Sequence, residues 1–168
     1  MPLKKLKIGV SACLLGMHCR YDGGTKLDAR IVERLHGRVD FYPVCPETEC
    51  GLPVPRDPMH LERSRNGTRL RVSATGEDVT MRMQGWADGK LEKIARADVA
   101  AFLLKSKSPS CALCSACVRD ACGRVVTERG SGLFAAMLRR AFPNMILSEE
   151  RDFDGFLKKL NLDVFRLD

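Results

Sequence analysis

The feature that most constrains the fold of this chain is a set of three cysteines, each of which follows a short apolar segment. The segments are residues 7–11, 39–44 and 99–104, and the cysteines are Cys13, Cys45 and Cys111. Apolar runs of this length are typical of buried strands. The carboxyl ends of parallel strands meet at one edge of a sheet. The pattern therefore predicts that three separate loops bring a thiol to the same edge.

Helical patterns alternate with these strands. Helices are expected at residues 28–35, 79–97, 132–142 and 153–160, and further strands at 69–73 and 145–147. The helix at 79–97 has a weak point at Gly85 or Gly89. Residues 46–67 and the cysteine-rich stretch before residue 132 are expected to be long loops. This order predicts one α/β domain over residues 1–168, with a mainly parallel open sheet and helices on both faces in a Rossmann-like three-layer arrangement.

Charge and composition exclude several classes of protein. The net charge of +7 is spread along the chain without a basic tail, and only 6% of the residues are aromatic, which argues against nucleic-acid binding as the main function. No apolar run reaches the roughly 18 residues of a membrane span. The first ten residues lack the apolar stretch of a signal peptide, so we expect a cytoplasmic protein whose eight cysteines are reduced. Nothing in the sequence indicates an oligomeric state.

The three strand-end cysteines are suited to an iron–sulfur cluster. Three thiolates from separate loops can hold three corners of a cubane and leave the fourth iron open to a substrate or water. The alternative is that Cys13, Cys45 and Cys111 are buried core residues, because free cysteine is among the most buried residue types. Because all three cysteines follow predicted strands, we favour a role for them as metal ligands.

A second arrangement of cysteines competes with the first. Cys111, Cys114, Cys117 and Cys122 have the spacing C-x2-C-x2-C-x4-C, which begins like a ferredoxin ligand run and also contains the C-x2-C pairs of zinc sites. A local cluster or zinc site would make the chain a non-enzymatic electron carrier or a zinc-binding module. We favour the three-loop cluster, which leaves the later cysteines of the run, together with Cys50, for a second metal, for sulfide binding or for packing.

Six segments of the chain resemble the DUF523 family, whose characterised members are 2-thiouracil desulfidases. They are SACLLG at 11–16, CRYDGG at 19–24, PVCPE at 43–47, GLPVPRDP at 51–58, TGEDVT at 75–80 and KSKSPSC at 105–111. The resemblance implies a [4Fe–4S] cluster held by Cys13, Cys45 and Cys111. It also implies that Glu47 and Ser108 lie close to the cluster and take part in removing sulfur from a thiocarbonyl pyrimidine. The family has no further cysteines after SPSC and tends to have Gly in place of Cys50.

The implied chemistry is consistent with the residue types. A soft iron prefers a thiocarbonyl sulfur to the oxygen and nitrogen atoms of the same ring. Glu47 could then deprotonate a water that attacks the carbon, while Ser108 donates a hydrogen bond to the ring or to the tetrahedral intermediate. The expected products are sulfide and the oxo form of a 2-thiouracil-like base or nucleotide. Arg20, Tyr21, Asp22 and Arg56 are candidates for substrate binding, although each has an equally good structural interpretation as a turn or ion-pair residue.

Overall fold

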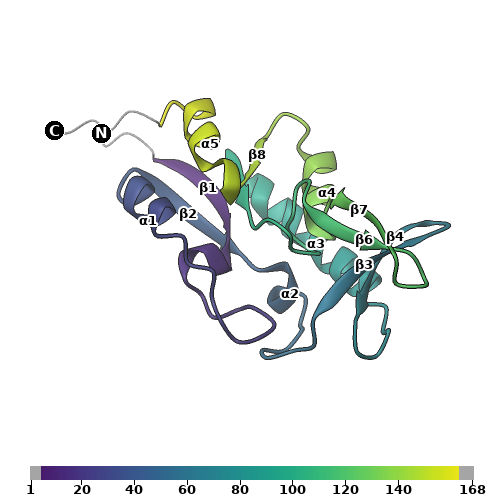
Figure 1. Ribbon diagram of the computed structural model, residues 1–168. Helices are drawn as coiled ribbons and strands as arrows, with labels where there is room; N and C mark the ends of the chain where they lie inside the picture. The colour runs from purple at the N-terminus through teal and green to yellow at the C-terminus, as the bar shows by residue number, and fades with distance from the viewer. Residues whose placement is uncertain (1–4, 163–168) are drawn as a thin grey trace.

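The computed structural model describes residues 5–162 and contains a four-stranded parallel sheet in the order β2-β1-β5-β8 (Figure 1). Its strands are β1 (Leu6–Ser11), β2 (Val39–Val44), β5 (Ala101–Leu104) and β8 (Ile146–Glu149). All four residues of β5 are buried, as expected for a strand that is covered on both faces. The predicted α/β class with a parallel sheet is confirmed.

Helices cover both faces of this sheet. They are α1 (Ala29–Leu35), α5 (Phe153–Lys159), α3 (Thr80–Arg96) and α4 (Leu133–Ala141). On one face Ala101 and Leu103 of β5 belong to the core formed with α1 and α5, and on the other face Phe102 and Leu104 belong to the core formed with α3 and α4. This division follows from the period of two along a strand, which sends successive side chains to opposite faces.

A close approach between two central strands explains why the first apolar segment contains a glycine. A Cβ atom at Gly9 of β1 would lie 2.1 Å from the ring of Phe102 in the neighbouring strand β5. Phe102 is fully buried and packs edge-on against Phe134 of α4, with ring centroids 6.2 Å apart. Only a residue without a side chain fits between them, and the two strands can therefore pair without displacing the ring.

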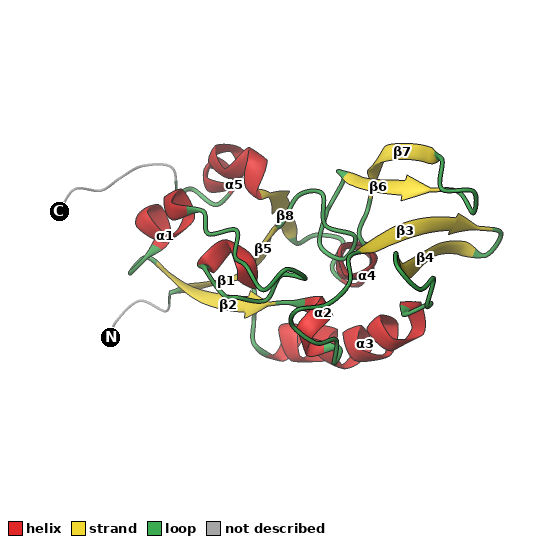
Figure 2. Ribbon diagram, turned by 60° about the horizontal axis from the view of Figure 1, so that its bottom comes forward, coloured by secondary structure: helices red, strands yellow, loops and turns green. Residues whose placement is uncertain are grey.

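A second four-stranded sheet, with the order β4-β3-β6-β7, was not predicted. It consists of β3 (Met59–Ser64), β4 (Gly67–Val72), β6 (Ala116–Arg119) and β7 (Val125–Gly130). Figure 2 shows these strands grouped on one side of the molecule and the parallel sheet on the other. Two antiparallel hairpins are joined by parallel pairing of β3 with β6. The expected long loops at 46–67 and before 132 are therefore wrong in part, since each contains strands.

The second sheet shares a core with the first. Leu61 of β3, Leu70 of β4 and Val118 of β6 are buried in the same cluster as Phe102. A short helix, α2 (Pro46–Glu49), connects β2 to this sheet, and 3-10 helices η1 (Ala12–Leu15) and η2 (Glu150–Asp152) follow β1 and β8. The long helix α3 is continuous through Gly85 and Gly89, so the expected weak point does not break it.

The strand order places a crevice at the carboxyl end of the parallel sheet. The chain leaves β1 through α1 toward β2 on one side, whereas β5 and β8 lie on the other side. The connections after β1 and β5 therefore diverge, and in open α/β sheets ligands bind where such connections separate. None of the helices among residues 5–162 is long and apolar enough to cross a membrane.

Candidate functional site

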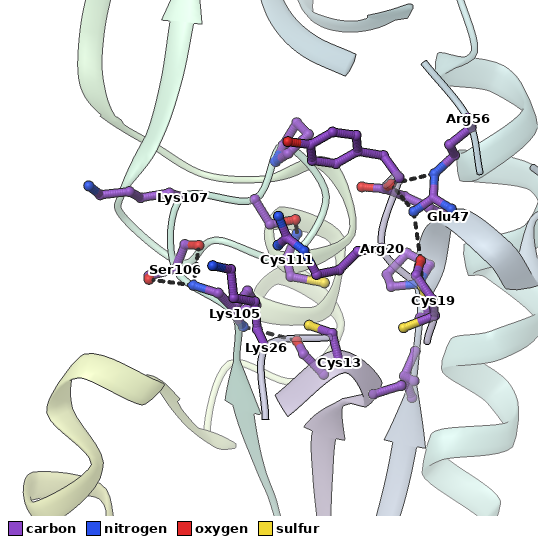
Figure 3. Close-up of a pocket in the computed structure, with 18 residues that line it drawn as sticks. Cys13, Cys19, Arg20, Lys26, Glu47, Arg56, Lys105, Ser106, Lys107 and Cys111 are labelled. Carbon is purple, nitrogen blue, oxygen red and sulfur yellow. Dashed lines mark hydrogen bonds and ion pairs between the residues drawn. The ribbon is translucent and has the colours of Figure 1, made fainter. Parts of the chain in front are cut away.

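A cavity of about 360 Å³ lies at the carboxyl ends of β1, β2 and β5 (Figure 3). Its walls come from the loop after β1, the start of α2 and the loop after β5. The sequence-predicted cysteines Cys13, Cys45 and Cys111 all line it, together with Glu47 and Ser108. The structure thus brings together, in one cavity, the five residues that were expected to carry the chemistry.

Each cysteine is held by a different local structure. Cys13 lies in η1, directly after β1, and its carbonyl accepts hydrogen bonds from the amides of Gly16 and Lys26. Cys45 is the N-cap residue of α2, where Pro46 occupies the first helical position that suits proline. Cys111 lies in the loop between β5 and β6. The three thiols therefore come from three separate connections.

The loop that carries Cys111 is fixed by the N-terminus of α4. The amides of Leu133 and Ala135 donate to the carbonyls of Pro109 and Ser110 at 3.0 and 3.1 Å. Gly132 makes this contact sterically possible, because a Cβ atom there would lie 2.4 Å from the Ser110 carbonyl carbon. Backbone groups at a helix start have no partner within the helix, and here the loop satisfies them.

Ser108 caps this loop from within. Its Oγ accepts hydrogen bonds from the amide of Ser110 at 3.2 Å and from the amide of Cys111 at 3.0 Å. Both bonds use the oxygen as acceptor, so the hydroxyl hydrogen of Ser108 stays available to a ligand in the cavity that this side chain lines.

Burial and mutual contact set the acidity of the four cavity thiols. A hydrogen bond from the Cys19 thiol lowers the pKa of Cys45 to about 6 and raises the pKa of Cys19 well above its usual range. Burial, with the charge of Cys45 adding to it, raises the pKa of Cys13 to about 11. Burial likewise raises the pKa of Cys111. Raised pKa values keep the thiols of Cys13, Cys19 and Cys111 protonated at neutral pH unless a positive charge in the cavity stabilises their thiolates.

The carboxylate of Glu47 is bound at both oxygens. Nε and Nη2 of Arg56 donate to Oε2 at 2.9 and 2.5 Å, and the hydroxyl of Ser110 donates to Oε1 at 2.8 Å. The side chains of Glu47 and Arg56 are only 13% and 6% exposed, so this ion pair is shielded from solvent. Arg56, one of the substrate-binding candidates, lines the cavity and forms this ion pair with Glu47.

The sequence profile of the 2-thiouracil desulfurase family matches residues 8–150, which include every cavity residue named above. The chain belongs to this family. It is 34% identical over 146 residues to the uncharacterized protein YbbK of Bacillus subtilis (strain 168), covering 84% of this chain and 95% of that relative. A solved structure, the [4Fe-4S]-dependent thiouracil desulfidase TudS, is similar to 94% of this chain and 99% of its own, with a TM-score of 0.75 and 32% identity.

Of the remaining substrate-binding candidates of this 2-thiouracil desulfurase family member, Arg20 and Tyr21 line the cavity and Asp22 does not. Arg20 and Tyr21 line the cavity, and the guanidinium of Arg20 lies over the Tyr21 ring, 5.3 Å from its centroid. Asp22 accepts a hydrogen bond from the amide of Gly24 at 2.9 Å and lies 3.5 Å from Arg20. Asp22 therefore supports the turn and the orientation of Arg20.

The other cysteines are not brought to the cavity. Cys50 is half-buried and does not line the cavity, and its thiol donates to the carbonyl of Glu47 at 3.3 Å. Cys114 is exposed, Cys117 lies on β6, and Cys122 is exposed in the turn between β6 and β7. Among residues 5–162, no three His, Cys, Asp or Glu side chains surround a single metal-ion position. The cysteine run that indicated zinc or a local cluster therefore extends over a loop, the strand β6 and the turn after it.

Several residues of the site were missed. Cys19 is buried at the cavity wall, beside Cys45, although the sequence analysis gave it no role. Its only signal was its place in the CRYDGG segment. Ser110 and the cavity lysines Lys26, Lys105 and Lys107 lack any local pattern that separates them from ordinary surface or turn residues. Their importance becomes visible only once the loops are folded together.

Proposed function

We propose that this protein is a [4Fe–4S]-dependent desulfidase that removes sulfur from a thiocarbonyl pyrimidine. The observation that carries the proposal is the presence of three thiols from separate loops and a buried carboxylate around one cavity. Membership of the 2-thiouracil desulfurase family and the similarity to TudS support it. The overall conversion replaces C=S by C=O, consumes one water, releases one sulfide and needs no net electron transfer.

We assign a cubane rather than a single metal ion to this cavity, because among residues 5–162 no three His, Cys, Asp or Glu side chains could hold a single ion. Cys13, Cys45 and Cys111 would hold three of its irons, and the convergence of their loops on one cavity is consistent with this ligand set. When bound, the cluster supplies an open iron that attracts a soft thiocarbonyl sulfur and makes its carbon more electrophilic. The proton transfer and the hydrogen bonds to the substrate are assigned to side chains of this protein.

Glu47 and Ser108 have complementary roles in the proposed reaction. Glu47 accepts a proton from the attacking water, which adds to the thiocarbonyl carbon. The oxygen of Ser108 accepts hydrogen bonds from two backbone amides. Its hydroxyl hydrogen is therefore donated to the ring or to the oxygen that the attacking water adds to the tetrahedral carbon. Collapse of that intermediate breaks the C–S bond, releases the sulfur as sulfide and, with loss of the proton from the new hydroxyl group, leaves the oxo-pyrimidine.

Positively charged side chains line the cavity, which favours a nucleotide over a free base. Lys26 and Lys107 line the cavity, and within residues 5–162 neither is paired with a carboxylate. Lys105, by contrast, is bound to Glu150 at 2.5 Å. Two unpaired cations beside a pyrimidine site would attract the phosphate of a thio-pyrimidine nucleotide. We expect the Lys26→Gln, Lys107→Gln double variant to raise KM for the 5′-monophosphate at least tenfold and to leave KM for the free base within a factor of two. Equal changes in the two KM values would contradict a phosphate contact by these lysines.

Sulfide release from 2-thiouracil or its nucleotide by anaerobically purified protein is the direct test. Cys13→Ser should remove the brown chromophore and the activity, whereas Cys122→Ser, which changes an exposed cysteine in the hairpin turn, should keep both. Glu47→Gln should keep the chromophore and lower kcat by about 10² to 10⁴. A chromophore that survives Cys13→Ser but disappears in the Cys114→Ser, Cys117→Ser double variant would reject the three-loop cluster.

A further inference from the structure

The geometry around Glu47 limits how this carboxylate can act. A carboxylate has about four acceptor positions, two on each oxygen. Oε2 accepts two N–H groups of Arg56, and Oε1 accepts one O–H group of Ser110. One acceptor position therefore stays open, on Oε1. The orientation of the whole carboxylate therefore determines where a water bound at this open position lies.

We propose that Arg56 and Ser110 are positioning residues that fix the Glu47 carboxylate so that the open lone pair of Oε1 faces the reacting water. This inference rests on the proposed function, because it assigns the two residues to the base of that reaction. Arg56 and Ser110 need not touch substrate in this arrangement. Their effect passes through Glu47.

Arg56 is itself anchored to two loops of the cavity. Its Nη1 donates to the carbonyl of Pro53 at 3.1 Å, its Nη2 to the carbonyl of Cys19 at 2.9 Å, and its amide to the carbonyl of Tyr21 at 2.8 Å. Figure 3 shows the guanidinium between Glu47 and Cys19. The planar guanidinium makes these bonds in fixed directions, which an ammonium group cannot do. Arg56 thus ties the orientation of Glu47 to the loop that follows β1.

Ser110 fixes the second oxygen from the opposite side. It is fully buried and lies outside the set of side chains that line the cavity. Its amide donates to Ser108 Oγ and its carbonyl accepts from Ala135, so its backbone is held on both sides. The two serines of the SPS segment thereby differ in role: the Ser108 hydroxyl faces the cavity, and the Ser110 hydroxyl contacts Glu47.

Such positioning has a measurable value. A glutamate side chain has several rotatable bonds, and displacement of a catalytic group by about 1 Å can lower a rate by about 10². Arg56→Ala should therefore lower kcat by about 100-fold with KM within a factor of three and with iron content unchanged. Ser110→Ala, which removes one neutral hydrogen bond, should lower kcat by about tenfold. Guanidinium ion added to Arg56→Ala should restore part of kcat, whereas Arg56→Lys should give an intermediate value because it keeps the charge without the planar group.

The matched control is Arg71→Ala. Arg71 forms a comparable ion pair with Glu62 at 2.8 Å, but in the second sheet, away from the cavity. This variant should keep the wild-type kcat. If Arg56→Ala loses iron, the Ser110→Ala and Arg56→Lys variants carry the test, since each leaves more of the local structure intact.

A double variant separates positioning from an independent role. If Arg56 acts through Glu47, then Arg56→Ala combined with Glu47→Gln should have the same kcat as Glu47→Gln alone. Losses that multiply in the double variant, or an Arg56→Ala variant with raised KM and wild-type kcat, would overturn the inference. Absence of any desulfidase activity in the wild type would instead refute the proposed function, so the two failures are distinguishable.

Discussion

Replacement of Glu149 by alanine should destabilise the loop that carries the cavity residues. Glu149 is the last residue of β8 and is only 5% exposed. Its Oε1 accepts hydrogen bonds from the amides of Leu113 and Cys114 at 2.9 and 3.0 Å and from the hydroxyl of Ser115 at 2.7 Å, while Oε2 binds Arg151. One carboxylate thus accepts hydrogen bonds from three consecutive residues just beyond Cys111.

The magnitude follows from the donors that would lose their acceptor. A buried donor left without a partner costs about 1–3 kcal/mol, but Cys114 is exposed and water can reach part of this loop. We therefore expect Glu149→Ala to lower the free energy of unfolding by about 3 kcal/mol. Glu149→Gln keeps an acceptor oxygen of the same shape and should cost about 1 kcal/mol. Losses of this size are a large share of the 5–15 kcal/mol that is typical of a domain.

The same carboxylate adds a pH dependence of known sign. Burial pushes the pKa of Glu149 upward, but the hydrogen bonds from Cys114, Ser115 and Arg151 outweigh it, so its pKa lies below the usual range. A depressed carboxyl pKa contributes stability above the pKa of the unfolded state, and this contribution is lost as pH falls through the folded-state pKa. The advantage of wild type over Glu149→Gln should therefore shrink in acid.

Urea denaturation of anaerobic protein at pH 7 and at a series of lower pH values measures both effects. Glu128→Ala, which removes an exposed glutamate on β7, serves as control and should change the free energy of unfolding by less than about 0.5 kcal/mol. A cost below about 1 kcal/mol for Glu149→Ala at pH 7, or a difference between wild type and Glu149→Gln that does not depend on pH, would refute the reasoning.

Two further predictions concern the thiols and the packing. In the metal-free protein, alkylation of Cys45 should reach half its maximal rate near pH 6. Cys19→Ala should move this midpoint to higher pH, because the hydrogen bond that stabilises the Cys45 thiolate is lost. An unchanged midpoint would contradict the hydrogen bond between the two thiols. Gly9→Ala should lower the free energy of unfolding by about 3 kcal/mol, because the added Cβ would overlap the buried ring of Phe102. Gly85→Ala in α3 has open space around it and should raise the free energy of unfolding by about 0.5–1 kcal/mol. Equal effects of the two variants in urea denaturation would contradict the packing argument.

The parallel sheet could be predicted because its strands carry a strong local signal. Strands buried on both faces need uninterrupted apolar residues, and β5 is the clearest case, with all four residues buried. The second sheet has a weaker signal, and the strand expected at 69–73, which corresponds to β4, is the one member of the sheet that the sequence predicted. In β3, polar residues surround Leu61, and in β7 the side chains are exposed or half-buried. These strands exist because they pair with one another and cover one side of the core, which a local pattern does not reveal.

The candidate site divides in the same way. Cys13 and Cys45 follow closely after β1 and β2, so local features of the sequence indicate their place near the sheet edge, whereas Cys111 lies within the long loop after β5. The contact between Arg56 and Glu47 has no such local signal, because the charge nearest to Arg56 in the sequence is Asp57, and the chain must turn back through residues 50–55 to bring the guanidinium to Glu47. Ion-pair partners are set by tertiary structure, so residue type alone left the role of Arg56 open.

The cysteine run after the cavity shows how one spacing can belong to two structures. A C-x2-C pair binds a metal only when the residues between the cysteines turn so that both thiols face the same point. Here β6 begins at Ala116, and an extended strand advances about 3.3 Å per residue, which carries Cys117 away from Cys114. The side chain of Asp120 then accepts hydrogen bonds from the amides of Cys122 and Arg124 and forms a hairpin turn. Pairing with β3 and β7 holds this strand extended, and binding of one metal by the run would require that pairing to break.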